Sequence, residues 1–166
     1  ITDTGRAKGE AYDARLILHL SRVDVLLPPA QQPFWKSMNS WITGSDLASA
    51  FAKKFSAVIE QNAGRDPRTL DYGVEAMLVK DLDGYQIGPH TDIRSRAVSA
   101  MFYLPPDESY QRYGTTLYLP KESGFRSDGN SHLSFDRFDK VETTPCKPNS
   151  LFAFARSDTS FHGVEP

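Results

Sequence analysis

The sequence changes character at residues 64–67, Gly-Arg-Asp-Pro, and this change limits the folds open to the chain. Before this point, apolar residues recur with the spacing of a helix; after it, short runs of β-forming residues alternate with turns rich in Gly and Pro. The strands predicted in this second part are residues 72–80, 98–104, 115–119, 138–143 and 151–155. Helices followed by a series of strands predict an α+β fold, mainly β, in which helices support one face of an antiparallel sandwich or barrel.

The part before residue 64 carries weaker β signals and clearer helical ones. Residues 14–20 and 23–27 are apolar runs rich in β-forming residues, and we predict that the first is a strand. Pro33 is tolerated at the first position of a helix and opens a short predicted helix that ends near Trp41.

A longer helix is predicted from Ser45 or Asp46, either of which can cap it, to about Gln61. Its apolar residues recur at helical spacing and define one stripe that faces a core. They are Leu47, Phe51, Phe55, Val58 and Ile59.

Composition excludes several classes of protein. At 166 residues the chain has the length of one domain, and its net charge of −2 gives no electrostatic argument for nucleic acid. Its apolar runs are far shorter than the roughly 20 residues that a membrane helix needs. A single cysteine, Cys146, excludes an internal disulfide framework and fits the reducing cytoplasm, where we expect the protein to be found.

The strongest chemical signal is the triplet His90-Thr91-Asp92. Successive side chains of an extended segment point to opposite faces, so His90 and Asp92 share a face. His162 follows the predicted strand 151–155, which would deliver it to a common site. Two His and one carboxylate form the facial triad that suits Fe(II) and leaves coordination positions open. The sequence therefore predicts a metal site of His90, Asp92 and His162.

The other two histidines have plainer interpretations. His19 lies inside the predicted strand 14–20 and is interpreted as an ordinary strand residue. His132 lies in the long polar stretch 121–137 and is interpreted as a solvated loop residue. Long loops without secondary structure are uncommon unless they serve a purpose, so this loop is either a lid over the site or a mobile surface insertion.

Three segments, in their order along the chain, resemble a known superfamily. Residues 76–105 comprise a strand, a Gly-containing turn, His-x-Asp, a short basic loop and a strand that ends in Phe-Tyr-Leu. Residues 114–119 resemble the Gly-x-Leu strand that follows, and residues 141–164 resemble a closing hairpin with Leu-Phe-x-Phe and Ser-x-His-x-Val. The pattern resembles the Fe(II)- and 2-oxoglutarate-dependent dioxygenases, in particular prolyl-hydroxylase-like bacterial members.

This resemblance implies a fold and a chemistry. The fold would be a double-stranded β-helix, or jelly roll, in one oxygenase domain, with residues 1–66 as a supporting strand and helices and residues 67–166 as a core that continues beyond both ends. His90, Asp92 and His162 would bind Fe(II), 2-oxoglutarate would chelate the iron, and O2 would be consumed with release of succinate and CO2. Halogenating relatives replace the carboxylate with a small residue, so Asp92 implies a hydroxylase.

The resemblance also implies contacts to the cosubstrate. Tyr103 matches a position that donates a hydrogen bond to the distal carboxylate of 2-oxoglutarate, although a phenol bonded to backbone at the core edge fits equally well. Ser99 shares its strand face, and Arg96, like Arg94, follows the triplet closely, where relatives position substrate. The basic partner of the distal carboxylate is expected on a strand beyond Pro166. The alternatives within the chain are Lys80, Arg96 and Arg156.

Two other classes of function remain open. A cupin-type jelly roll could bind a metal or a small ligand without turnover, and a zinc-dependent hydrolase could use the same three ligands with a carboxylate as general base. For an oxygenase, the expected partners are 2-oxoglutarate and a small-molecule, peptide or glycan substrate. Nucleic acid is disfavoured and a membrane is not expected.

Overall fold

The computed structural model describes residues 14–166, so the start of the predicted 1–66 segment lies outside the described residues. The described chain forms two compact units, and each is assembled from two stretches of sequence. The first contains residues 14–54 and 66–85, and the second contains residues 55–65 and 86–166.

The first unit combines one strand pair with short helices. Strand β1 (Arg15–His19) pairs in antiparallel fashion with β2 (Met77–Asp81), so that Ile17 lies opposite Val79. The helices are α1 (Val23–Leu26), α2 (Gln32–Ile42) and α3 (Ser45–Lys54). The strand predicted at residues 14–20 is confirmed, and so is the helix that begins at Pro33. His19 is a strand residue, as predicted, and its Nδ1 lies 3.0 Å from a carboxylate oxygen of Glu75.

Two segments of this unit differ from the β signals in their sequence. Residues 23–27 were read as β-rich, but Val23–Leu26 is a helical turn. Val23 is buried with Leu20 and Ala76 in a core cluster, and helical spacing puts Leu20 and Val23 on one side. The strand predicted at 72–80 begins only at Met77.

The long helix predicted from residue 45 to 61 is two helices. They are α3 and α4 (Ser56–Ala63), and Phe55 between them has a non-helical backbone with φ −103° and ψ 16°. The apolar stripe continues through the break, so periodicity alone does not reveal it. Helix α4 ends at Gly64, whose left-handed φ of 64° is favourable for glycine.

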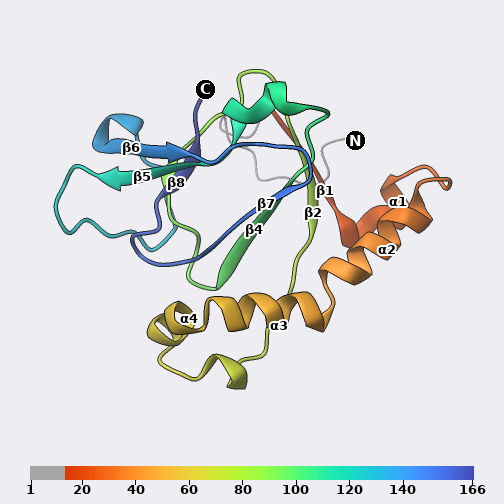
Figure 1. The fold of residues 1–166 in the computed structure, drawn as a ribbon, viewed down its shortest axis with the longest axis horizontal. Helices are drawn as coiled ribbons and strands as arrows, with labels where there is room; N and C mark the ends of the chain where they lie inside the picture. Colours follow the sequence, from red (N-terminus) through yellow and green to blue (C-terminus); the bar gives the residue numbers. More distant parts are fainter. Residues whose placement is uncertain (1–13) are drawn as a thin grey trace. The chain divides into compact units, whose positions relative to one another are not determined.

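The second unit consists of antiparallel strands in two sheets and helix α4 (Figure 1). Its strands are β3 (Ile87–His90), β4 (Val98–Tyr103), β5 (Thr116–Pro120), β6 (Phe138–Thr143), β7 (Ser150–Ala155) and β8 (His162–Val164). One sheet has the order β3-β8-β5-β6, and β4 pairs with β7 in the other. The pairs are nested: β5 with β6, β4 with β7, and β3 with β8.

The observed class is therefore α+β with antiparallel sheets, as predicted, although helix and strand occur in about equal amounts within residues 14–166, which are therefore not mainly β. The strands predicted at 98–104, 115–119, 138–143 and 151–155 are confirmed to within about one residue at each end. The short strands β3 and β8 were not predicted. Much of the predicted β region is loop, because the strands are short.

An aromatic cluster forms the core of the second unit. Tyr118, Phe138 and Phe161 are buried in it. Phe125, Leu133 and Phe135 pack against them from the 121–137 loop. This loop therefore contributes apolar side chains to the core, which does not fit the interpretation of a mobile insertion.

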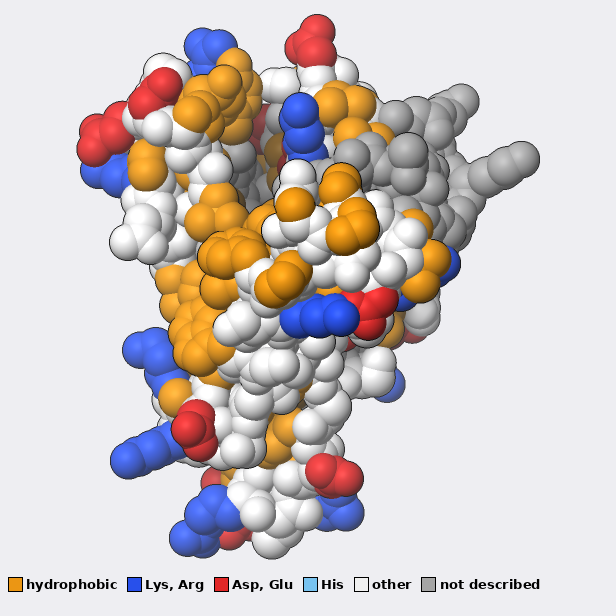
Figure 2. Space-filling view, turned by 90° about the vertical axis from the view of Figure 1, so that its right-hand side faces the viewer, with side chains coloured by type: hydrophobic (Ala, Val, Ile, Leu, Met, Phe, Trp, Pro, Cys, Tyr) orange, Lys and Arg blue, Asp and Glu red, His pale blue; other side chains and the backbone are white. Residues whose placement is uncertain are grey.

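The surface and helices bear on the expected partners. No helix within residues 14–166 has both the length and the apolar character needed to cross a membrane. Figure 2 shows Lys and Arg side chains mixed with Asp and Glu side chains on the face that it presents. A face on which the two signs of charge are mixed in this way has no broad field of one sign that would attract a polyanion.

We predict that Phe138→Ala destabilises the protein by about 3–5 kcal/mol, because it removes a large buried ring and leaves a cavity between Tyr118 and Phe161. Urea unfolding followed by circular dichroism measures the change. Leu119→Ala on the neighbouring strand is the control, since Leu119 is 60% exposed. Equal losses of unfolding free energy in the two variants would contradict the assignment of this core.

Candidate metal centre

The pairing of β3 with β8 brings the two predicted histidine ligands together. His90 at the end of β3 lies directly opposite His162 at the start of β8, and their ring centroids are 4.4 Å apart. The register shifts between Ile87, which lies opposite Val164, and His90. This irregularity sets His90 rather than its neighbour Pro89 opposite His162. A β-bulge next to a site commonly redirects a side chain in this way.

Close strand packing at this point requires a glycine. Gly163 follows His162 in β8, and a Cβ atom on it would overlap the carbonyl oxygen of Ile87. Only a residue without a side chain lets β8 approach β3 this closely.

Asp92 completes the group two residues after His90. Among the residues that the structure describes, His90, Asp92 and His162 form a group able to hold a metal ion, and their ligand atoms all lie within 4.8 Å of one another. Ligand atoms that share one ion at about 2.1 Å lie about 3–4 Å apart, so small side-chain rotations would bring all three to one ion. The structure thus brings the predicted triad together.

Backbone carbonyls orient both imidazoles. Nδ1 of His90 lies 3.0 Å from the carbonyl oxygen of Gly88, and Nδ1 of His162 lies 3.0 Å from that of Ser160. A carbonyl only accepts hydrogen bonds, so each Nδ1 carries the proton and each Nε2 keeps its lone pair. A contact of this kind fixes the tautomer of a metal-binding histidine.

Burial keeps these imidazoles neutral. It lowers the pKa of His90 to about 4, and the neighbouring His162 acts in the same direction. Burial also lowers the pKa of His162, although the Ser160 carbonyl and Asp92 oppose the shift. Near neutral pH both rings therefore present an unprotonated nitrogen, the form that binds a metal.

Asp92 is held as a carboxylate by two neighbours that the sequence had assigned to the cosubstrate. The Ser99 hydroxyl donates to Oδ2 at 2.6 Å, and Arg96 donates to Oδ1 at 2.9 Å. Burial raises the pKa of Asp92, but the Ser99 hydrogen bond and the nearby His162 and Arg96 outweigh it, so the pKa lies below its usual value. Each oxygen accepts more than one bond, so both retain capacity for a metal.

The Tyr103 hydroxyl has partners within the protein. It donates to Oγ1 of Thr115 at 2.8 Å and accepts a hydrogen bond from the Thr115 backbone N–H at 3.0 Å. The hydroxyl of Thr144 lies 3.1 Å away. This is the backbone-bonded arrangement of the alternative interpretation, and a cosubstrate carboxylate would have to compete with these contacts.

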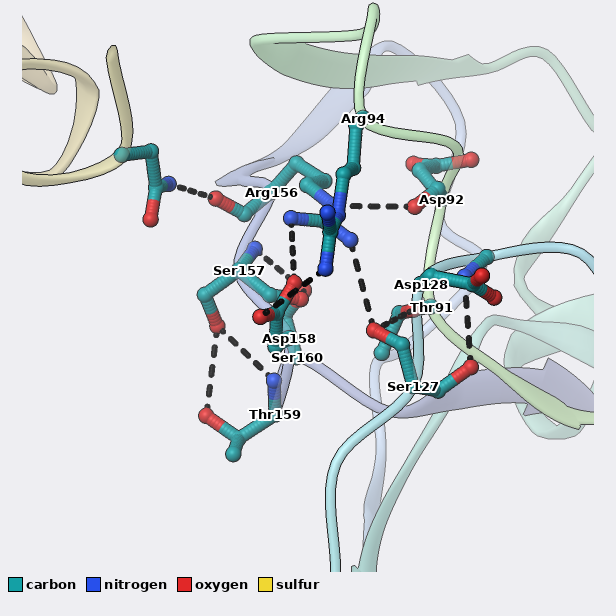
Figure 3. Close-up of polar contacts among 12 residues, drawn as sticks. Thr91, Asp92, Arg94, Ser127, Asp128, Arg156, Ser157, Asp158, Thr159 and Ser160 are labelled. Carbon is teal, nitrogen blue, oxygen red and sulfur yellow. Dashed lines mark hydrogen bonds and ion pairs between the residues drawn. The ribbon is translucent and has the colours of Figure 1, made fainter.

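The other basic residues considered as partners of the cosubstrate or substrate lie in different surroundings. Arg156 is buried, and its guanidinium contacts Asp92, Ser127 and Asp158 (Figure 3). Arg94 is exposed and lies 3.8 Å from Asp158. Lys80 belongs to the other compact unit.

The 121–137 loop is attached to the ligand segment by its backbone. The Leu133 N–H donates to the carbonyl oxygen of Pro89 at 2.9 Å, and the buried Thr91 hydroxyl donates to that of Ser127 at 3.2 Å. Gly129 has φ 89°, and a Cβ atom on it would overlap the carbonyl oxygen of Asp92. The loop therefore lies alongside the segment that carries His90 and Asp92 and is hydrogen-bonded to it.

His132 is the site residue that sequence reasoning missed. Its side chain is exposed, as predicted, but its ring lies against His90 with 4.7 Å between the centroids. The usable signal was its position in an unusually long loop between strands that flank the site. His132 is not a member of the ligand group itself.

Comparison of the chain with models of protein families, with curated proteins and with solved structures finds no match. The donor set therefore carries the argument for a metal. Two neutral imidazole nitrogens and one carboxylate suit a divalent first-row metal ion.

We predict that Ser99→Ala lowers the affinity for Co(II) about tenfold, because Asp92 loses one of the two donors that orient it. Isothermal titration calorimetry measures the affinity. Ser150→Ala is the matched control, since the Ser150 hydroxyl also donates a hydrogen bond, at 2.8 Å, but to the carbonyl of Lys147. An unchanged affinity in Ser99→Ala would argue against Asp92 as a ligand.

We further predict that His132→Ala changes Co(II) affinity by less than about threefold, whereas His90→Ala lowers it more than about 100-fold. His132 lies beside the ligand group, so its loss removes no coordinating atom. The same calorimetry compares the two variants. Comparable losses would show that His132 is a fourth ligand.

Proposed function

We propose that the second unit is a jelly roll. The nested pairing of β5 with β6, β4 with β7 and β3 with β8 describes a two-stranded ribbon folded back at the β5–β6 connection. Successive pairs alternate between the two sheets, and β8 also pairs with β5. This alternation supports the proposal of a double-sheet jelly roll.

We propose that the protein is an Fe(II)- and 2-oxoglutarate-dependent oxygenase, most simply a hydroxylase. The observation that carries the proposal is the convergence of two neutral imidazoles and one ionised carboxylate at the β3–β8 pair. Three protein ligands leave coordination positions open for a cosubstrate and O2, as in Fe(II) oxygenases. The order of sequence motifs supports the same family.

The residues of the site have distinct roles in this proposal. His90, Asp92 and His162 would hold the iron, which together with 2-oxoglutarate and O2 would supply the oxidising chemistry for hydroxylation of the substrate with release of succinate and CO2. The carbonyls of Gly88 and Ser160 hold the imidazoles in the binding tautomer.

Arg96 is better placed than Tyr103 to meet a carboxylate of 2-oxoglutarate. It uses Nη1 for Asp92 and is 43% exposed, so its other N–H groups can serve an incoming anion. An arginine fork is suited to such a carboxylate. The Tyr103 hydroxyl, in contrast, already contacts Thr115 and Thr144.

The zinc hydrolase is less well supported. It would need a carboxylate as general base in addition to the ligands. The metal-binding group contains one carboxylate, Asp92, which acts as a ligand and is bonded to Ser99 and Arg96. The substrate is proposed to be a small molecule, a peptide or a glycan, since the net charge of −2 gives no electrostatic argument for nucleic acid.

An anaerobic titration tests this function. We predict that metal-free protein treated with Fe(II) and then with 2-oxoglutarate develops a weak visible charge-transfer band that neither ligand produces alone. His162→Ala should abolish the band, because the iron loses a ligand. His19→Ala is the matched control and should retain it, since His19 contacts Glu75 in the other compact unit.

Other results would redirect or reject the proposal. A bound metal without a band would favour a cupin-type binding module or the hydrolase. No bound metal would reject the triad. Decarboxylation of 2-oxoglutarate by His90→Ala at the wild-type rate would show that the ligands are misassigned.

A further inference from the structure

Arg156 is a buried arginine placed between the segments that carry the metal ligands. It follows β7 directly, and the residue is 6% exposed. Nε donates to the backbone carbonyl of Asp92 at 3.0 Å, and Nη2 donates to that of Ser127 at 3.3 Å. Nη1 lies 2.6 Å from Oδ1 of Asp158. Figure 3 shows these groups converging on one guanidinium.

The contacts of Arg156 lead toward His162 as well as Asp92. Asp158 lies in the turn before β8, where the Ser157 N–H donates to Oγ of Ser160 at 2.9 Å and this hydroxyl donates back to the Ser157 carbonyl at 3.0 Å. The Ser160 carbonyl in turn contacts Nδ1 of His162. One side chain thus links both ligand segments.

The same side chain also fixes the 121–137 loop. Ser127 accepts a hydrogen bond from Arg156, and its N–H donates to the Asp158 carbonyl at 2.9 Å. The Thr91 hydroxyl, between the ligands His90 and Asp92, donates to the same Ser127 carbonyl. Ser127 is therefore the loop residue that is hydrogen-bonded to Arg156, Asp158 and Thr91.

Arginine is required here for a geometric reason. A guanidinium directs several N–H donors in one plane and can serve Asp92, Ser127 and Asp158 together, whereas the compact ammonium of lysine acts as a single charged centre. Asn62 of α4 also donates to the Arg156 carbonyl, which fixes the backbone that carries the guanidinium. A lysine keeps the charge and loses the simultaneous contacts.

We propose that Arg156 is a positioning residue that couples the 121–137 loop to the metal ligands, so that metal binding and ordering of the loop reinforce each other. The inference rests on the metal site of the proposed function and needs neither 2-oxoglutarate nor a known substrate. In this proposal the loop covers the site in a way that depends on the bound metal, and it holds His132 against His90.

Limited proteolysis tests this coupling. Trypsin can cut after the exposed Arg126, directly before Ser127. In the unchanged protein, saturating Co(II) should slow this cleavage about tenfold, because the ordered ligands hold Ser127 through Arg156. In Arg156→Lys, cleavage without metal should be faster, and protection at saturating Co(II) should fall below about twofold.

Arg94→Lys is the matched control. Arg94 also lies near Asp158, at 3.8 Å, but its side chain is 70% exposed. This variant should retain the protection by metal. Asp158→Asn removes the ion pair with Arg156 and should give an intermediate loss of the protection by Co(II). This variant provides a second test if Arg156→Lys does not fold.

The outcomes separate this inference from the proposed function. If the unchanged protein binds Co(II) and Arg156→Lys or Asp158→Asn keeps full protection, the coupling through Arg156 is refuted and the metal site stands. If the unchanged protein binds no Co(II), both the proposed function and the inference are overturned. Loss of protection in Arg156→Lys together with its retention in Arg94→Lys would support the coupling.

Discussion

The register of β3 against β8 is the constraint on which the site depends. His90 and His162 are far apart in the sequence and meet in one candidate metal site only because they are cross-strand neighbours. Side chains directly opposite in an antiparallel pair have Cβ atoms about 5 Å apart. Had the pairing at Ile87 and Val164 continued without a shift, Pro89 would stand opposite His162. A slip of one residue turns side chains to the other face of a sheet.

The site resolves a conflict between burial and charge. Burial favours neutral imidazoles, which is the state that a metal requires, but it opposes the carboxylate of Asp92. Ser99 and Arg96 offset that opposition, so neutral imidazoles and an ionised carboxylate coexist in one partly buried group. The resulting set of two neutral nitrogens and one anionic oxygen is complementary to a cation. Arg156 then joins the ligand segments to the loop that borders them.

The candidate ligands could be predicted from the sequence because their residue types and order are informative. Asp92 lies two residues after His90, and His162 follows a strongly apolar strand, so alternation and strand order predict that they meet. The strands β4 to β7 were equally readable from their apolar and aromatic runs. The helical break at Phe55 was not, since the apolar stripe runs through it.

Other features depend on contacts that no local pattern encodes. Ser99 and Arg96 were assigned to a cosubstrate but hydrogen-bond Asp92, because the pairing of β4 with β7 and the turn after Asp92 determine what they can reach. The approach of His132 to His90 depends on how a long loop packs its own aromatic residues into the core. The β-rich run at residues 23–27 contains a helical turn, Val23–Leu26, which buries Val23 in a core cluster. These are tertiary effects that override local preference.

The central claim is that one metal ion is held by His90, His162 and Asp92, and a count of coordinating imidazoles tests it most directly. X-ray absorption spectroscopy of the Fe(II)-loaded protein gives this count. The account predicts two imidazoles, and one after His162→Ala with Fe(II) in excess. A site with no imidazole, or a count that His162→Ala leaves unchanged, would contradict it.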